Sequence, residues 1–257
     1  MTGLAHRHLE GRRALVTGAS SGIGFATALS LADAGADIVL GVRSPEKAQG
    51  LVHMITKMGR SCTIAQMDML DLGSVVHAFD QAVASVGTID ILVNNAGGGI
   101  GDMALDVSPK DFDHSIALNV KAPFFLSQRF AKSLVGARQS GDIVNISSQA
   151  ALVALPGEPV YCLSKAAMSH MTRCLAIEWG AYGIRVNAVA PTFIETPGTE
   201  DALSVPTFKA DTVDRIAALN RLGQPEEVAS CVIFLVSSGA SLVTGHILVV
   251  DGGWTIR

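Results

Sequence analysis

The sequence predicts an α/β fold: a doubly wound, seven-stranded parallel sheet with helices on both faces. Two observations predict it. Short apolar segments alternate with longer amphipathic segments along the whole chain, as they do in proteins built from repeated strand–helix units. The short segments are apolar at successive positions rather than at every second position, which is typical of parallel strands covered on both faces.

Apolar runs such as RALVT and DIVLGV predict four strands in the first half of the chain, at residues 13–17, 37–42, 61–67 and 89–93. The amphipathic segments between them predict helices that end near residues 34, 58 and 86. Gly35 and Gly59 directly follow the first two helices, where glycine commonly ends a helix. The regular alternation in this half favours parallel pairing of the strands.

The second half repeats the pattern with longer helices. Strands are expected at residues 142–146, 184–190 and 247–250, and helices at residues 109–135, 158–182 and 225–237. Pro123 lies inside the first of these helices, so two consecutive or kinked segments are expected there. Residues 192–220 form a loop-rich insertion with a short helix of its own. No linker-like stretch divides the chain, so residues 1–257 are expected to form a single domain.

Composition and charge exclude several classes of protein. The 257 residues are 49% hydrophobic and 16% charged, which supplies ample material for a buried core. A net charge of −4 gives no basis for a nucleic-acid-binding surface. No segment approaches the roughly 18 uninterrupted apolar residues of a membrane span. We therefore expect a globular protein that binds neither nucleic acid nor a membrane.

The N-terminal segment and the cysteines indicate a cytoplasmic protein. Residues 1–13 are polar and lack the apolar centre of a signal peptide. The cysteines are scattered along the chain, and we expect them to be reduced thiols: Cys62, Cys162, Cys174 and Cys231. The seven histidines are dispersed as well, without a metal-ligand spacing. No metal site is expected.

A glycine-rich turn, residues 18–24 (GASSGIG), separates the first strand from the first helix. Glycines allow a tight turn and let backbone N–H groups approach a phosphate, while the helix N-terminus favours negative charge. The spacing is G-x-x-x-G-x-G rather than G-x-G-x-x-G, but the turn stands where dinucleotides bind in a Rossmann fold. The residues expected to contact such a cofactor are Gly18, Ser20, Ser21, Gly22, Ile23 and Gly24.

This turn has two alternative interpretations. Residues 18–22 also match G-x-S-x-G, the nucleophile elbow of hydrolases. That elbow requires an acid and then a histidine later in the chain, and His246, the last histidine, precedes the final strand instead of following it. The hydrolase hypothesis is therefore disfavoured. The other alternative is a glycine turn that binds no ligand.

The end of the second strand indicates which nucleotide binds. An acid there, about 20 residues beyond the glycines, would hold the adenosine ribose hydroxyls and select NAD. Residues 41–44 are Gly-Val-Arg-Ser, and Asp37 stands at the other end of the strand. Arg43 can pair with a 2′-phosphate, and Ser44 can hydrogen-bond to it. We therefore expect NADP(H) in preference to NAD(H); the alternatives are that Arg43 stacks on adenine or faces solvent.

A tyrosine and a lysine are spaced for proton transfer. Tyr161 and Lys165 are four residues apart, which places them on one face of the expected helix. A nearby ammonium favours the phenolate and lowers the pKa of a tyrosine. Such a tyrosine can exchange a proton with a carbonyl or an alcohol near neutral pH. Because the same spacing is common on ordinary helix surfaces, its meaning depends on the other motifs.

With these motifs together, the chain resembles the short-chain dehydrogenase/reductase family from about Leu9 to Trp254. The motifs that carry the resemblance occur in the order typical of the family: Thr17-Gly18 with Gly22 and Gly24, Asp68, Asn94-Asn95-Ala96-Gly97, Asn119, Ser148, Tyr161 with Lys165, and Asp251-Gly252-Gly253. The resemblance implies a Rossmann fold and a hydride transfer between a nicotinamide and a secondary alcohol or ketone.

The resemblance also implies the catalytic residues Asn119, Ser148, Tyr161 and Lys165. Tyr161 would be the general acid/base, and Ser148, preferred over its neighbour Ser147 by the family's spacing, would polarise the substrate carbonyl. Lys165 would bind the nicotinamide ribose and lower the pKa of Tyr161. Asn119 would expose a carbonyl or hold a water that links Lys165 to solvent.

Further cofactor contacts follow from the same resemblance. Asp68 would accept a bond from the adenine amine with Met69 beside the ring, although capping of a helix is an alternative role for Asp68. Asn95, Ala96 and Gly97 would line the cofactor after the fourth strand.

The segment after the sixth strand departs from the family's pattern. The family usually has Pro-Gly there, and this chain has Pro191-Thr192, which makes the start of that loop less flexible. Pro191 would still lie at the nicotinamide site. Ile194 and Thr196 match positions that meet the carboxamide and the pyrophosphate.

The substrate is expected to contact residues 98–103, 150–160 and 192–220. These segments mix acidic with apolar side chains, including Glu158, Glu195 and Leu155. The run 190–200 (APTFIETPGTE) looks most like family members that act on sugars, polyols or sugar acids.

Two other functions are alternatives. A 3-oxoacyl-carrier-protein reductase would need a basic patch for its acidic carrier, and Arg129, Lys132 and Arg138 could supply one. A non-catalytic nucleotide-binding regulator is disfavoured by the intact catalytic set.

A homotetramer is also expected. The helix at 158–182 carries apolar side chains that suggest a subunit interface: Met168, Met171, Leu175 and Ile177. His170 and Trp179 are either interface or core residues.

Overall fold

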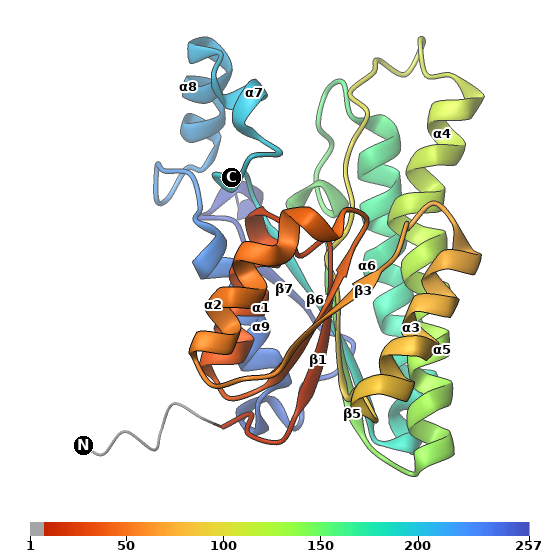
Figure 1. Cartoon of the computed structure of the whole chain (residues 1–257). Helices are drawn as coiled ribbons and strands as arrows, with labels where there is room; N and C mark the ends of the chain where they lie inside the picture. The colour runs from red at the N-terminus through yellow and green to blue at the C-terminus, as the bar shows by residue number, and fades with distance from the viewer. Residues whose placement is uncertain (1–7, 257) are drawn as a thin grey trace.

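The computed structural model describes residues 8–256, so residues 1–7 of the polar N-terminal segment lie outside the described residues. Seven parallel strands form one sheet in the order β3-β2-β1-β4-β5-β6-β7 (Figure 1). Their bounds are β1 Arg13–Thr17, β2 Asp37–Val42, β3 Cys62–Gln66, β4 Ile91–Asn94, β5 Gly141–Ile146, β6 Ile184–Pro191 and β7 Ile247–Val250. The expected fold class, a single-domain Rossmann fold, is confirmed.

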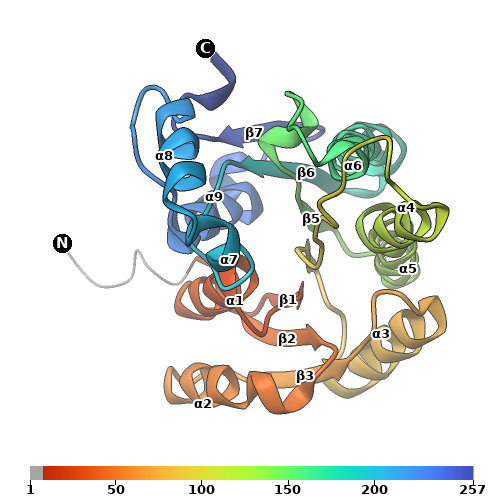
Figure 2. The ribbon, with the colours of Figure 1, turned by 90° about the horizontal axis from the view of Figure 1, so that it is seen from above.

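Helices cover both faces of the sheet. Figure 2 shows α1, α2 and α9 on one side and α3, α5 and α6 on the other, with α4 beside α5. The α-helices of the described chain are α1 Gly22–Asp33, α2 Gln49–Lys57, α3 Leu72–Val86, α4 Pro109–Ile116, α5 Ala122–Ala137, α6 Pro159–Trp179, α7 Glu200–Leu203, α8 Pro206–Arg215 and α9 Pro225–Val236. Short 3₁₀ turns occupy Pro45–Ala48, Gln149–Ala151, Gly180–Tyr182, Ser238–Ala240 and Trp254–Ile256.

The core has one layer on each side of the sheet. Within β1, Ala14 and Val16 belong to one apolar cluster, and Leu15 belongs to the other. All three side chains are fully buried. Successive side chains of a strand point to opposite faces, and both faces are covered here, which explains why the strands are apolar at every position.

The long helix expected at 109–135 is interrupted. Helix α4 ends at Ile116, a π-helical turn spans Ala117–Lys121, and α5 begins at Ala122. Pro123 lies in the first turn of α5, where its missing N–H leaves no hydrogen bond unmade. The expected pair of segments is confirmed, and the π-turn between them contains Asn119.

The apolar surface of α6 is used within the subunit. Met168, Met171 and Leu175 are buried in the cluster between α6 and the sheet, and Trp179 packs against the same cluster. Because these side chains are already buried within the subunit, they leave little surface for the interface that was expected to cover them as well as the sheet. Ile177 alone of the four expected interface residues is exposed, at 86%.

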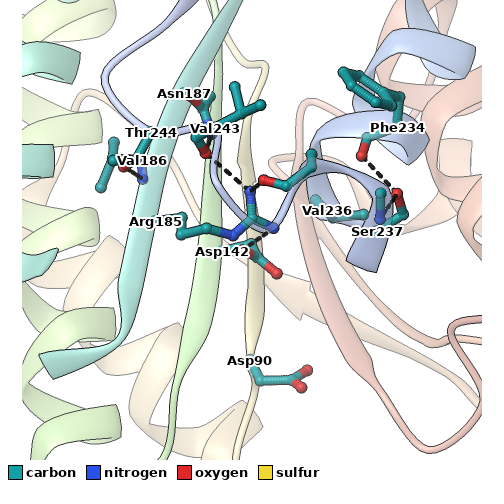
Figure 3. Close-up of polar contacts among 12 residues, drawn as sticks. Asp90, Asp142, Arg185, Val186, Asn187, Phe234, Val236, Ser237, Val243 and Thr244 are labelled. Atoms are coloured by element: carbon teal, nitrogen blue, oxygen red, sulfur yellow. Dashed lines mark hydrogen bonds and ion pairs between the residues drawn. The ribbon is translucent and has the colours of Figure 1, made fainter.

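An ion network joins the strands at the edge of the sheet where they begin. Arg185 of β6 pairs with Asp142 of β5 at 2.6 Å and donates to the backbone carbonyl of Val243 (Figure 3). Arg12 pairs with the same Asp142 carboxylate at 2.9 Å and with Asp90, which precedes β4. Four central strands are thus tied together at their amino ends.

The opposite edge carries the loops that follow the strands. The strand order reverses between β1 and β4, so the loops after these two strands diverge and leave a crevice at the carboxyl edge. Helices α7 and α8, from the insertion at 192–220, stand above this edge in Figure 1. This arrangement places the glycine turn, the Asn94–Gly97 segment and the start of α6 around one region.

Candidate active site

The glycine turn is tight and leaves the N-terminus of α1 open to a ligand. Gly18 and Gly22 have φ angles of +65° and +56°, which side-chain-bearing residues rarely adopt. A side chain at Gly24 would collide with the Gly18 carbonyl and the Asn95 amide. The hydroxyl of Ser21 makes no capping bond, and no acid lies in the first turn of α1. The first N–H groups of α1 are therefore available to an anion such as a phosphate.

Hydrogen bonds from Thr17 lock the loop after β4 to the glycine turn. Its hydroxyl accepts from the backbone N–H groups of Asn95 at 2.9 Å and Ala96 at 3.0 Å. The Asn95 amide donates back to the Thr17 carbonyl at 2.8 Å. Thr17 was expected only as part of the glycine motif, and the signal for its role in the sequence is a threonine at the end of an apolar strand.

The adenosine end of the expected cofactor site has an exposed cation. Arg43 is exposed just beyond β2 and is followed by Ser44, and no ion pair to the Arg43 guanidinium exists among residues 8–256. Asp68 accepts a bond from the Leu70 N–H at 3.0 Å. The N-cap of α3 is Asp71, so the alternative role of Asp68 as the helix cap was wrong.

The other predicted cofactor residues differ in how far their side chains are buried. Thr196 packs against the glycine turn, since a Cβ atom at Gly22 would lie 3.2 Å from the Thr196 Cβ. Pro191 ends β6 and is buried, and Ile194 is buried beside a bridge to Gly223. Met69 is 8% exposed and belongs to the apolar cluster under α3, so most of its surface faces the core.

Tyr161, Lys165 and Ser148 come together at the start of α6. The Lys165 Nζ lies 5.6 Å from the centre of the Tyr161 ring and donates to the Ile146 carbonyl at 2.8 Å. The Ser148 side chain lies close enough to Tyr161 to lower its pKa, and the Ser148 hydroxyl also accepts from the Ala150 N–H at 3.1 Å. The Ser147 hydroxyl is instead 3.2 Å from the Lys165 carbonyl and 2.8 Å from Ser169. Ser148, rather than Ser147, is therefore the serine that faces the tyrosine.

Burial controls the protonation of this group. It raises the pKa of Tyr161, an effect that the Ser148 side chain opposes and the negative charge of Glu158 reinforces. It lowers the pKa of Lys165 to about 8. Lys165 was expected to lower the pKa of Tyr161, but it is not among the groups that shift this pKa, and burial, the largest cause, raises it. Tyr161 therefore holds its proton, as an acid that donates to a carbonyl must.

The side chain of Asn119 fixes the loop after β4 to α6. Its amide nitrogen donates to the Gly98 carbonyl at 2.9 Å and to the Ser164 hydroxyl at 3.0 Å, and its oxygen accepts from the Gly98 N–H at 3.1 Å. A Cβ atom at Gly97 would lie 2.8 Å from the same oxygen. π-turns inside helices are frequent at functional sites. This one places the Asn119 side chain within hydrogen-bonding distance of the loop after β4. Ser164 was not predicted as a site residue.

Among residues 8–256, no group of three or more histidine, cysteine, aspartate or glutamate side chains could hold a metal ion. Instead, the glycine turn, with its open helix N-terminus, and the pair formed by half-buried Tyr161 and buried Lys165 both lie at the carboxyl edge of the sheet. A dinucleotide fits these features: the open N–H groups of α1 suit its phosphates, and Gly18 and Gly97 let the loop after β4 pack against the glycine turn and Lys165. Fold and site together define a dinucleotide-dependent oxidoreductase.

Comparison with known proteins makes the assignment specific. A family model described as enoyl-(acyl carrier protein) reductase matches residues 18–255. The chain is 38% identical to 2-dehydro-3-deoxy-D-gluconate 5-dehydrogenase of Escherichia coli (strain K12), with 97% of each chain covered. It is 37% identical to D-threitol dehydrogenase of Mycolicibacterium smegmatis, over 97% of this chain and 95% of the relative. The protein belongs to the short-chain dehydrogenase/reductase family and is an oxidoreductase acting on CH–OH groups.

Further similarities bear on cofactor and substrate. A 3-oxoacyl-[acyl-carrier-protein] reductase FabG of Thermotoga maritima is 38% identical over 96% of this chain and 99% of its own. The gluconate 5-dehydrogenase of Burkholderia cenocepacia, solved with NADP and tartrate, superposes with a TM-score of 0.92 at 34% identity, and 98% of each chain is covered. A 7α-hydroxysteroid dehydrogenase solved with NADH also has a TM-score of 0.92, at 35% identity and 98% coverage of each chain.

Proposed function

We propose that this enzyme interconverts a secondary alcohol and the matching ketone on a polyol, sugar or sugar acid, with NADP(H) as its preferred cofactor. The observation that carries the proposal is the group of Ser148, Tyr161 and Lys165 at the crevice that the glycine turn also borders. Asn119 completes the proposed catalytic set by holding the Gly98 loop against α6.

The proposed roles follow from protonation and position. The nicotinamide supplies or accepts the hydride when it is bound. In reduction, the Tyr161 phenol donates its proton to the substrate oxygen, and in oxidation the phenolate removes the hydroxyl proton. Ser148 hydrogen-bonds the same oxygen and stabilises the charge that develops on it. Lys165, with a pKa near 8, can give a proton to Tyr161 or take one from it.

The preference for a carbohydrate substrate over an acyl carrier rests on the relatives and on the surface of α5. Relatives named for gluconate derivatives and threitol match the chain along nearly its whole length. The basic patch that an acidic carrier would need is largely engaged. Arg129 forms a two-bond ion pair with Asp80, and Lys132 hydrogen-bonds to Gln128.

A 3-oxoacyl-carrier-protein reductase remains the second candidate, because a reductase of that name is as similar in sequence as the gluconate relatives. The two candidates share the catalytic group and differ only in what docks at the mouth of the site. The third hypothesis, a non-catalytic regulator, has no specific observation in its favour.

The proposed preference for NADP(H) depends on Arg43. Its guanidinium is exposed at the end of β2, where an acid would select NAD. Arg43→Ala should reduce kcat/KM with NADP⁺ by about 10- to 100-fold, because a charge-assisted hydrogen bond to the 2′-phosphate is lost. The kcat/KM with NAD⁺, which lacks that phosphate, should be nearly unchanged. An equal loss with both cofactors would contradict the role of Arg43.

The remaining assignments are also proposals: a cytoplasmic homotetramer that binds neither nucleic acid nor a membrane, whose substrate contacts the 192–220 insertion. No helix within residues 8–256 is long and apolar enough to cross a bilayer. Phe112 of α4 and Phe125 of α5 are 40% and 38% exposed, as side chains at a subunit interface are in an isolated subunit. Size-exclusion chromatography with light scattering, which measures the molar mass of the protein in solution, tests the oligomeric state.

A panel assay of reduced-nicotinamide absorbance tests the activity. It offers polyols, aldoses and sugar acids with NADP⁺ or NAD⁺, and acetoacetyl thioesters with NADPH. Turnover of a carbohydrate that Tyr161→Phe abolishes is the expected result. Turnover of the thioester alone would favour the carrier-protein reductase, and no turnover with cofactor binding retained would favour the regulator.

A further inference from the structure

One acidic side chain beside Tyr161 has no partner within the described chain. Glu158 precedes α6 and occupies its N-cap position, but its side chain makes no capping bond. No hydrogen bond or ion pair to this carboxylate is formed by any residue from 8 to 256. Glutamate is not a preferred N-cap residue, so the helix does not explain its presence.

The backbone holds Glu158 toward the site. Gly157, with φ of +78°, comes before it, and Pro159 follows in the first turn of α6. The Glu158 N–H donates to the Leu155 carbonyl at 3.1 Å. These constraints leave the backbone little freedom at this position, so the Cα–Cβ bond of Glu158 has a fixed direction.

The loop after β4 leaves room for this carboxylate. A Cβ atom at Gly99 would lie 2.5 Å from the Glu158 Oε2, and one at Gly101 would lie 3.5 Å from its Oε1. Any side chain at residue 99 would therefore displace the carboxylate. The glycines of this loop let it pass closely over Glu158 while the acid stays half-buried beside Tyr161.

Glu158 and Tyr161 line the same narrow cleft, together with Ile100 of the loop and Asp111 of α4. Within the described chain, no lysine, arginine or histidine lines this cleft. Asp111 is engaged with Ser108, which caps α4. Glu158 and Asp102, the other two acids of the cleft, have no hydrogen bond or ion pair among residues 8–256, and of these two only Glu158 raises the pKa of Tyr161 through its charge.

We propose that Glu158 is a specificity-determining residue, whose carboxylate accepts a hydrogen bond from a substrate hydroxyl near the reacting carbon and rejects substrates with a carboxylate there. This inference rests on the function proposed above and narrows it to neutral polyols and ketoses, with sugar acids disfavoured. A hydroxyl donating to a carboxylate forms a charge-assisted bond. A substrate carboxylate at the same place meets a like charge in a half-buried cleft with no cation to offset it.

Matched pairs of substrates test the proposal. Threitol against threonate and xylitol against xylonate differ only by a terminal carboxylate, and kcat/KM is measured for each with NADP⁺ and NAD⁺. The wild type should prefer the polyol by at least about tenfold, and Glu158→Gln should remove most of that preference. The control is Glu178→Gln, which removes one negative charge from an exposed position near the other end of α6 and should leave the ratio unchanged.

A second measurement does not depend on the substrate. The chain has only two tyrosines, Tyr161 and Tyr182. In a Tyr182→Phe background, the ultraviolet absorbance of phenolate therefore reports the pKa of Tyr161 alone. Adding Glu158→Gln should lower that pKa, because a neighbouring negative charge is removed. Because exposure of Tyr161 on unfolding would also lower its pKa, circular dichroism must first show that Glu158→Gln is as folded as Glu178→Gln, whose Tyr161 pKa should be unchanged.

The outcomes separate the two proposals. A wild type that oxidises aldonates faster than polyols, or a ratio that Glu158→Gln leaves unchanged, overturns the inference while the proposed function stands. Turnover of neither class by wild type, with cofactor binding intact, overturns the proposed function and the inference that rests on it. An unchanged pKa of Tyr161 in Glu158→Gln overturns the placement of the acid itself.

Discussion

The two edges of the sheet differ in how many partners surround a buried charged side chain. At the amino edge, Asp142 is shared by Arg12 and Arg185, and each guanidinium has further oxygen partners. At the carboxyl edge, Lys165 is fully buried with one backbone carbonyl as its partner, and its pKa falls to about 8. The first arrangement holds strands together. The second leaves an amine and a phenol ready to exchange a proton.

The comparison teaches that burial alone does not mark a catalytic group. Burial also raises the pKa of Asp142, even beside two guanidinium groups. What differs is whether the charge is satisfied by fixed partners. Partners that hold a charge in place stabilise the fold, and a buried group without them is available to a substrate.

The largest expected effect is on chemistry at the carboxyl edge. Tyr161→Phe removes the hydroxyl and keeps the ring, so kcat should fall by about 1,000-fold or more, in the range of lost general acid–base catalysis. Cofactor affinity, measured by fluorescence of the reduced nicotinamide, should stay within about twofold. Retention of more than a tenth of the wild-type kcat would show that another group transfers the proton.

At the amino edge the expected effect is on stability instead. Asp142→Ala leaves two arginines without their shared partner, which should cost about 3–5 kcal/mol of the free energy of unfolding. Urea denaturation measures this loss, and the activity of the folded fraction should be unchanged. The exposed ion pair between Asp80 and Arg129 is the control. Asp80→Ala should change the free energy of unfolding by no more than about 0.5 kcal/mol.

Alanine substitutions at two glycines distinguish an effect on the active site from an effect on the stability of the fold. Gly97→Ala places a Cβ atom 2.8 Å from the Asn119 oxygen and 3.3 Å from the Lys165 Nζ, so the loop or the lysine must shift. We expect kcat/KM to fall by about 10- to 100-fold. Gly136→Ala, inside α5 with no atom within 4 Å of the new Cβ, should stabilise the protein by about 0.5–1 kcal/mol at unchanged activity. Equal activity of the two variants would contradict the role of the Gly97 contact.

Most of the fold could be predicted from the sequence, because strand and helix periodicity are local properties. All seven strands were expected, and β4 begins two residues later than expected because Asp90 turns to Arg12. The π-turn at Asn119 could not be predicted, since its partners Gly98 and Ser164 are distant in the sequence.

The proposed catalytic residues could be named from motifs, but the direction of their pKa shifts could not. The direction of the Tyr161 pKa depends on burial by the assembled loops, which no spacing reveals. The same holds for the apolar side chains of α6. They were expected to pack against another subunit as well as the sheet, whereas Met168, Met171 and Leu175 are already buried within the single subunit. Glu158 was grouped with other acids at the mouth, and only the structure shows that it lacks a partner among the described residues.

The most direct test of the difference between the two edges is the stability of Lys165→Met at two pH values. Because the pKa of Lys165 is about 8 in the fold and 10.5 in the unfolded chain, the unfolded chain binds the proton more tightly. The cost of burying the lysine, about 3 kcal/mol, is fully present below pH 8 and fades as the pH rises toward the unfolded value. Loss of the bond to the Ile146 carbonyl offsets about 1 kcal/mol of the gain.

The inactive variant should therefore be more stable than the wild type by about 1–2 kcal/mol in urea at pH 7. That advantage should disappear near pH 10, where the wild-type lysine is neutral in the fold. A variant that is less stable than the wild type at pH 7, by an amount that does not change with pH, would contradict the account: Lys165 would then stabilise the fold, as the arginines at the amino edge do.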